Sequence, residues 1–453
     1  MTETASSAAV VVDAGSRPRG IVTEQDVVRR IAWRVEPDQA VEAVMTTPVV
    51  VVGADDYLFE AVALMRRRKF RHVPVVDGDG AVIGMLGLDA ALDFLSSENL
   101  TLIDQLTHEE SIEGLKRVKL AQVELVSALL QKNVPVPEVQ ALLTEINNDI
   151  HRRALRQLEA AMREDGWGEP PSRFSVIIMG SGGRGENFLA PDQDNGFVIA
   201  DDEDGGQGRR KDAYFLELAE RMTGMLDAVG FRRCIGNVMA TNQVWRKTLS
   251  DWRRQIDTWI SRCEPEMLMN CGIFFDFRHG FGDPELSIQL RAHITEVVPK
   301  FPQFLRRVFA VESDRGNVAL GWLGGLRKES HGDERRGVVN LKLRGTLPLV
   351  EGARLLALKA GIPATSTLAR LAALRDLGAL NAADHDDLAD AFRHLTHLLL
   401  RQQLEDFRAG REVGNYVPEE RLSRREKKHL LASFRAIENL RATLRMEFSS
   451  GSL

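Results

Sequence analysis

The sequence predicts an α/β protein whose C-terminal part is entirely helical. Three observations support this class: a repeated strand–turn–strand–helix pattern near the N-terminus, a short apolar strand that enters a glycine-rich turn, and long stretches of helical periodicity. A chain of 453 residues is long enough for about three domains or more. We expect segments at 1–98, 99–165, 166–285 and 286–453.

Composition excludes several classes of protein. The net charge of −6 and the pI near 6.0 provide no general attraction to nucleic acid or to an anionic membrane. No apolar run reaches the ~18 residues of a membrane-spanning helix, and Met1–Gly15 lacks the basic and apolar regions of a signal peptide. The three cysteines follow no Cys-x-x-Cys spacing, which favours a reducing compartment over a disulfide or zinc framework. We therefore expect a cytoplasmic protein.

The segment 1–98 contains the repeat. Its first copy is incomplete, and there Thr23 is expected to cap a helix with Asp26 in the first turn. The repeat resembles a CBS pair, a module that often binds adenine nucleotides and pairs into homodimers. In that family a Thr-x-x-Asp holds the ribose, and Thr23 and Asp26 match it. Gly87 stands where the second copy should have Thr or Ser, and Asp89 comes one residue early. We expect at most one nucleotide site, and a purely structural module remains the alternative.

The segment 99–165 is expected to form two helices, separated at Pro135 and Pro137. It leads to the stretch that carries the chemistry. Residues 174–179 form an apolar run that reads as a buried strand, and 180–183 contains three glycines beside Ser181. Backbone N–H groups in such a turn can surround phosphate oxygens.

Two acids follow this turn. Asp192 and Asp194 lie two residues apart, so on an extended strand both carboxylates face one side. Such a pair suits Mg²⁺, which commonly takes one or two carboxylates and then nucleotide phosphates. An acidic pair beside the Asn195-Gly196 turn signal also occurs on surfaces without function.

The order of these features resembles the nucleotidyltransferases of the DNA polymerase β superfamily: an apolar strand, Gly180-Ser181, a gap, then Asp192-x-Asp194. The residues around Arg184 are most similar to the PII-uridylyltransferase branch, and the whole chain resembles nucleotidyltransferases with a CBS pair in front and a helical domain behind. The resemblance implies a polymerase-β-like sheet, a Mg²⁺ cofactor, an NTP donor and possible transfer to a PII-like protein. It also implies that Gly180, Ser181, Gly182, Gly183 and Arg184 contact the nucleotide, although Arg184 equally allows a salt bridge to Glu186.

Two further regions are candidates for the site. Residues 272–278 have the pattern of a central strand with Asp276 inside it, and the resemblance implies a third carboxylate there. Ion pairing with Arg278 is the structural alternative. Beyond 286 we expect helices, interrupted at 340–345, where Lys342 and Arg344 would face one side if extended and suit nucleotide phosphates.

The sequence therefore predicts a Mg²⁺-dependent nucleotidyltransferase in which Asp192, Asp194 and Asp276 are catalytic and the CBS pair binds an adenine nucleotide. A non-catalytic nucleotide sensor or scaffold is the main alternative, and a small-molecule nucleotidyltransferase is a third.

Overall fold

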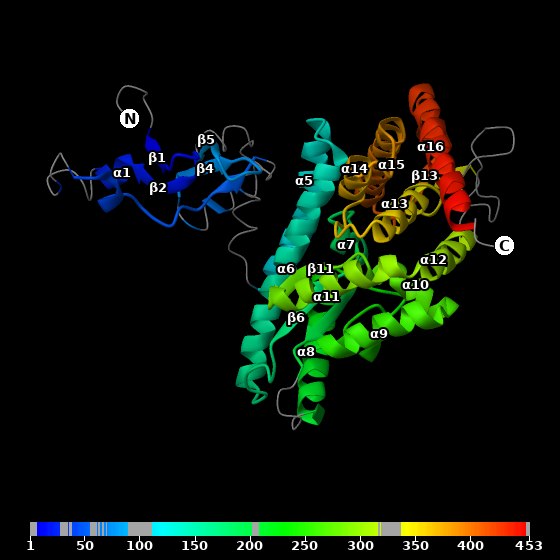
Figure 1. Cartoon of the computed structure of the whole chain (residues 1–453), viewed down its shortest axis with the longest axis horizontal. Helices are drawn as coiled ribbons and strands as arrows, with labels where there is room; N and C mark the ends of the chain where they lie inside the picture. The colour runs from blue at the N-terminus through cyan, green and yellow to red at the C-terminus, as the bar shows by residue number, and fades with distance from the viewer. Residues whose placement is uncertain are drawn as a thin grey trace. The chain divides into compact units, whose positions relative to one another are not determined.

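The computed structural model describes residues 7–27, 35, 39–54, 61, 64, 65, 68, 70–88, 111–201, 208–315, 318 and 337–449. The chain divides into two compact units, Met1–Glu109 and Glu110–Leu453 (Figure 1). The expected segments 99–165, 166–285 and 286–453 thus fall almost entirely within the second unit.

The first unit contains two small sheets. Strands β1 (Ala8–Val12) and β2 (Pro18–Thr23) form an antiparallel hairpin. Strands β3 (Val52–Gly53), β4 (His72–Val76) and β5 (Val82–Gly87) form the second sheet, in which β3 is parallel and β5 antiparallel to β4. The strand order confirms the repeated pattern over the described residues, whereas Asp89 lies outside them.

The second unit begins with the two expected helices, α5 (Ile112–Gln131) and α6 (Val136–Glu164). Pro135 caps α6 and Pro137 lies in its first turn, where a missing backbone N–H leaves no helical hydrogen bond broken. The prolines therefore separate the helices without disturbing either one.

A mixed four-stranded sheet has the order β10-β8-β6-β11. Strands β6 (Phe174–Ile178) and β8 (Asn195–Ile199) are antiparallel and buried throughout, which explains their continuous apolar sequence. Strand β10 (Arg246–Thr248) is parallel to β8, and β11 (Arg278–Gly282) is antiparallel to β6. Helices α8 (Gly208–Val229), α9 (Leu249–Arg262) and α11 (Pro284–Val297) follow the strands in the chain.

An irregular loop at residues 234–241 follows β9 (Arg232–Arg233). The strand expected at 272–278 is wrong over most of its length. Residues 272–274 belong to helix α10 (Pro265–Phe274), and a turn separates this helix from β11. The apolar run misled the prediction because Phe274 packs among aromatic side chains on a buried helix face, stacked on Trp252 at 4.6 Å between ring centroids.

The C-terminal helices are confirmed. They are α12 (Pro302–Arg315), α13 (Leu347–Lys359), α14 (Thr367–Asp376), α15 (Ala382–Arg408) and α16 (Arg424–Ser449). The last four gather at the end of the sheet where β6 leads into α7 (Gly180–Arg184) (Figure 1). One apolar core extends from Ile177 in β6 to Phe448 in α16, so sheet and helices form a continuous body.

The segment expected to be extended at 340–345 is not. Strand β12 (Val338–Asn340) pairs with β13 (Tyr416–Pro418), and a π-helical turn over Lys342–Thr346 follows. Lys342 and Arg344 therefore do not alternate along a strand.

Candidate functional site

The two acids lie at the edge of the sheet where β6 ends and β8 begins. The backbone N–H of Met179, directly after β6, donates to the carbonyl of Asp194 at 2.9 Å. Strand β7 (Asp192–Gln193) pairs in parallel with β9, which places Asp192 opposite Arg232. The Asp192 side chain is 46% exposed and its Oδ1 is 3.9 Å from Arg232 Nε.

The surroundings of Asp194 disfavour its charged form. Burial raises the pKa of Asp194, a hydrogen bond from the Cys234 thiol lowers it, the like charge of Asp192 raises it, and the charges of Lys342 and Arg184 lower it. The net pKa lies above the usual value. Among the described residues, its Oδ1 is buried and accepts no hydrogen bond. A buried carboxylate oxygen without a partner is costly, and a bound cation removes that cost.

The glycines before the acids serve close packing. Gly180 has φ of +58°, and a Cβ there would lie 2.7 Å from Asp194 Oδ2. A Cβ on Gly183 would lie 1.7 Å from the Asp276 carbonyl oxygen. The expected open turn is instead the short helix α7, in which the Ser181 hydroxyl donates to Asn187 Oδ1 at 3.1 Å. Gly182 likewise packs on Ile178.

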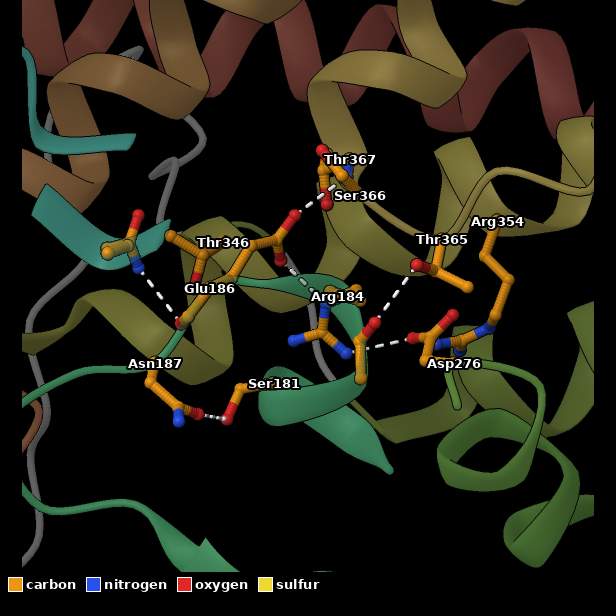
Figure 2. Close-up of polar contacts among 12 residues, drawn as sticks. Ser181, Arg184, Glu186, Asn187, Asp276, Thr346, Arg354, Thr365, Ser366 and Thr367 are labelled. Atoms are coloured by element: carbon orange, nitrogen blue, oxygen red, sulfur yellow. Dashed lines mark hydrogen bonds and ion pairs between the residues drawn. The ribbon is translucent and has the colours of Figure 1, made fainter. Parts of the chain in front are cut away.

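Asp276 does not join the other two acids. Within the described ranges there is no group of three or more His, Cys, Asp or Glu side chains placed to hold a metal. The Asp276 carboxylate is fully buried and contacts the guanidinium groups of Arg184 and Arg354 at 2.8 and 2.9 Å (Figure 2). It also contacts the guanidinium group of Arg370 at 2.7 Å. It therefore acts as the counter-ion of an arginine cluster, which corrects the expected catalytic carboxylate.

The expected structural partner of Asp276 is also wrong. Arg278 instead pairs with Glu145 of α6 at 3.0 Å. Arg184 makes the salt bridge to Glu186 that the sequence allowed, at 2.6 Å, in addition to its contact with Asp276. Its guanidinium is thus held by two carboxylates.

Lys342 lies in the π-helical turn that precedes α13. It is exposed, and its charge lowers the pKa of Asp194. Arg344 is half-buried and has a polar partner of its own.

Sequence reasoning missed Arg232 and Cys234. Burial, followed by the charge of Asp194, raises the pKa of the Cys234 thiol to about 11, so the thiol remains a hydrogen-bond donor to that carboxylate. Both residues approach the acids through the pairing of β7 with β9, and two-residue strands leave no readable periodicity.

The acidic pair fits Mg²⁺. The ion is a hard cation that takes oxygen ligands and commonly uses only one or two carboxylates together with phosphates and water. Asp194 offers an unpaired buried oxygen, and Asp192 offers an exposed carboxylate beside it. The donor set therefore suits a metal that a nucleotide brings with it.

The N-terminal pair forms a capping box. The Asp26 Oδ2 accepts hydrogen bonds from the Thr23 backbone N–H at 3.0 Å and from its hydroxyl at 2.8 Å. The Asp26 backbone N–H donates to Thr23 Oγ1 at 3.3 Å. The expected cap at the start of α1 (Glu24–Asp26) is confirmed.

Family models match three stretches of the chain. Residues 41–97 match a CBS domain, residues 121–266 match a domain described as "Putative nucleotidyltransferase DUF294", and residues 302–448 match a domain described as "Putative nucleotidyltransferase substrate binding domain". The chain thus combines a CBS domain with a DUF294 domain and its C-terminal domain. Asp192 and Asp194 lie within the DUF294 match, and Asp276 lies outside it.

Curated relatives match about a fifth of the chain. An uncharacterized protein of Methanopyrus kandleri is 33% identical over 94 residues, 20% of this chain and 48% of that protein. An uncharacterized 33.4 kDa protein in a ribosomal RNA operon of Thermofilum pendens is 34% identical over 100 residues, 22% of this chain and 33% of that protein. The CBS domain-containing protein CBSCBSPB3 of Arabidopsis thaliana is 40% identical over 87 residues, 19% of this chain and 16% of that protein. The chain spans less than half the length of each.

Solved structures with CBS domains are also similar. A CBS domain protein from Pyrobaculum aerophilum complexed with AMP is 28% identical, with a TM-score of 0.20, and the match covers 23% of this chain and 78% of that one. A CBS-domain containing protein from Agrobacterium tumefaciens is 28% identical, with a TM-score of 0.19, and the match covers 20% of this chain and 75% of that one.

Searched over the described residues, the chain has no helix long and apolar enough to span a membrane.

Proposed function

We propose that this chain transfers a nucleoside monophosphate from a nucleoside triphosphate to an acceptor, with Asp192 and Asp194 as the metal-binding acids. One observation carries the proposal: Asp194 presents a buried carboxylate oxygen that has neither a hydrogen-bond partner nor an ion pair among the described residues, whereas the buried Oδ1 of Asp276 is paired with Arg370. Nearby groups compensate the charge of Asp194 only in part, and carboxylates left in that state are candidates for functional sites. The DUF294 match includes both acids.

The residues have distinct roles in this proposal. Asp192 and Asp194 hold the ion, and Gly180–Gly183 and Ser181 face the triphosphate. Lys342, whose charge reaches Asp194, neutralises the phosphates. Mg²⁺ bound there supplies charge neutralisation and orientation, the main contributions to catalysis of phosphoryl transfer. Arg184 affects the site through its charge and not by contacting the triphosphate, because its guanidinium is paired with Glu186 and Asp276.

Nucleotide binding tests the acids first. In calorimetry with each Mg²⁺·NTP, Asp194→Asn should bind at least ~10-fold more weakly than the wild-type chain, because the metal loses an anionic ligand. Asp376→Asn is the matched control, since that carboxylate is 65% exposed and pairs only with its neighbour Arg375 in the described structure. Equal affinity of Asp194→Asn and the wild type would exclude the metal site.

We further propose that UTP is the nucleotide donor and that a PII-like signalling protein is the acceptor. Incubation with each α-labelled NTP, Mg²⁺ and a cell extract identifies them. A labelled protein band supports a protein acceptor, and a labelled small molecule supports a small-molecule transferase.

A non-catalytic nucleotide sensor is the second candidate. The position of Asp276 favours it, because transfer needs a group that orients or accepts the acceptor's proton, and Asp276 is committed to three arginines. Binding of Mg²⁺·NTP without any label transfer would support the sensor.

For the CBS module we propose an adenine nucleotide held by Thr23 and Asp26, as its family resemblance implies. Asp26→Ala in the full chain should weaken binding of AMP or ATP there and leave Asp194-dependent binding unchanged. If AMP and ATP bind equally well to the variant, the module is structural, and homodimerisation would be its remaining expected role.

A further inference from the structure

We infer that Glu186 and Thr365 are positioning residues for the nucleotide site, because they fasten the segment 180–187 to the C-terminal helical domain. The consequence for nucleotide binding rests on the proposed function of Asp192 and Asp194. The fastening itself follows from contacts within the second unit, which join this segment to Thr365 and Thr367 of the C-terminal domain (Figure 2).

Glu186 joins three elements. Its side chain is 9% exposed, and Oε2 accepts from Arg184 Nε at 2.6 Å. Its Oε1 accepts from the backbone N–H of Thr367, the first residue of α14, at 2.6 Å. Its backbone carbonyl accepts from Gln140 Nε2 of α6 at 3.0 Å. One buried residue therefore links the end of α7 to helix α6 and to the C-terminal domain.

Thr365 forms a hydrogen bond with α7 itself. Its hydroxyl donates to the Gly183 carbonyl at 2.9 Å, and Arg278 Nε donates to the same oxygen at 3.2 Å. This carbonyl lies in the helix that begins with Gly180, the residue packed against the Asp194 carboxylate. A shift of Gly183 would move the backbone that borders the acid.

The opposite side of the segment is held by α6. The backbone N–H of Asn187 donates to Thr144 Oγ1 at 3.0 Å, and Asn187 Oδ1 accepts from the Ser181 hydroxyl. Ser181 is thus oriented by α6 through Asn187, while Gly183 and Glu186 are held by Thr365 and by the first residue of α14. The glycine-rich segment is fixed from two sides by residues distant in the sequence.

The arginine cluster completes the attachment. Arg184 also contacts Asp276, whose carboxylate receives Arg354 from α13 and Arg370 from α14. The chain of contacts from Glu186 through Arg184 to Asp276 therefore connects α7 to both of these helices. This gives the C-terminal domain a part in shaping the site, apart from any contact with an acceptor.

Hydrogen exchange of the full chain without nucleotide tests the fastening. The amide protons of Gly185 and Glu186 are hydrogen-bonded within the segment, and that of Gly183 is hydrogen-bonded to the carbonyl of Met179, directly before it. In Thr365→Val, which keeps the shape and loses the hydroxyl, the peptide containing them should exchange at least ~10-fold faster. Thr365→Ser, which retains the donor, should restore the wild-type rate. Thr258→Val is the matched control, because that hydroxyl also donates to a backbone carbonyl, in α9.

Exchange in Thr365→Val at the wild-type rate would overturn the inference. Calorimetry then separates it from the proposed function. If the wild type binds Mg²⁺·NTP, Thr365→Val and Glu186→Gln should each bind at least ~10-fold more weakly, and unchanged affinity in both would also overturn the positioning role. If the wild type binds no nucleotide while exchange accelerates as expected, the fastening stands and the proposed function fails.

Discussion

Asp194 is half-buried with one fully buried oxygen, Asp276 is fully buried, and the surroundings of the two carboxylates are opposite. Burial raises the pKa of Asp194, and the nearby Lys342 and Arg184 do not restore it to its usual value. Burial would also raise the pKa of Asp276, but the guanidinium groups of Arg370, Arg354 and Arg184 hold it well below its usual range.

The difference separates structure from function. A buried carboxylate that receives three guanidinium groups has its charge compensated within the protein and has little capacity left for a ligand. A carboxylate with an unpaired buried oxygen lacks compensation until a cation arrives. The sequence pattern marked both as catalytic, and only their partners distinguish them.

The largest expected effect is on stability. Asp276→Asn should lower the free energy of unfolding by about 3–5 kcal/mol, because it leaves buried arginines without their counter-ion. Asp194→Asn should change it by less than about 1 kcal/mol, since it removes a charge that the fold does not compensate. Urea unfolding measures both. Equal losses in the two variants would remove the contrast between the acids.

A buried cation extends the comparison. Lys119 of α5 is 8% exposed, and its ammonium contacts only uncharged groups in the described structure: the amide oxygens of Gln122 and Asn147, and the ring of Phe231 at 4.6 Å. Burial lowers the pKa of Lys119 from 10.5 to about 7. In Lys119, as in Asp194, burial shifts the pKa toward the uncharged form.

The pH dependence follows from proton binding. Between pH 7 and 10.5 the unfolded chain holds the Lys119 proton and the folded chain does not, so this residue's contribution to the free energy of unfolding rises with pH. Relative to Lys119→Met, the wild type should therefore gain about 1–3 kcal/mol in its free energy of unfolding between pH 7 and pH 9. Urea unfolding at both values gives the result, and a difference independent of pH would contradict it.

The smallest effect is expected at the surface. Arg375 and Asp376 form an ion pair with side chains 43% and 65% exposed. Asp376→Asn should change the free energy of unfolding by less than about 0.5 kcal/mol, because water screens the pair. A loss comparable with that of Asp276→Asn would show that burial does not explain the contrast.

Local pattern was sufficient where one element buries one continuous face. The apolar residues 174–178 become β6, and the helical periodicity beyond 346 becomes α13 to α16. It failed at 272–278, where an apolar run buried on a helix has the same composition as a buried strand. The sequence also did not predict the pairing of β7 with β9, because a two-residue strand is too short to show a periodic pattern of apolar residues.

The sequence by itself determined the CBS-like repeat, the strand before the glycines, the acidic pair and the C-terminal helices, because these depend on neighbours close in the chain. Tertiary structure alone decided which charges are compensated. Arg354 and Arg370 reach Asp276 across 78 and 94 positions, and Lys342 approaches Asp194 from another part of the chain. Electrostatic energy depends on distance and burial in space, so whether a carboxylate is a counter-ion or a ligand site follows only from the packed structure.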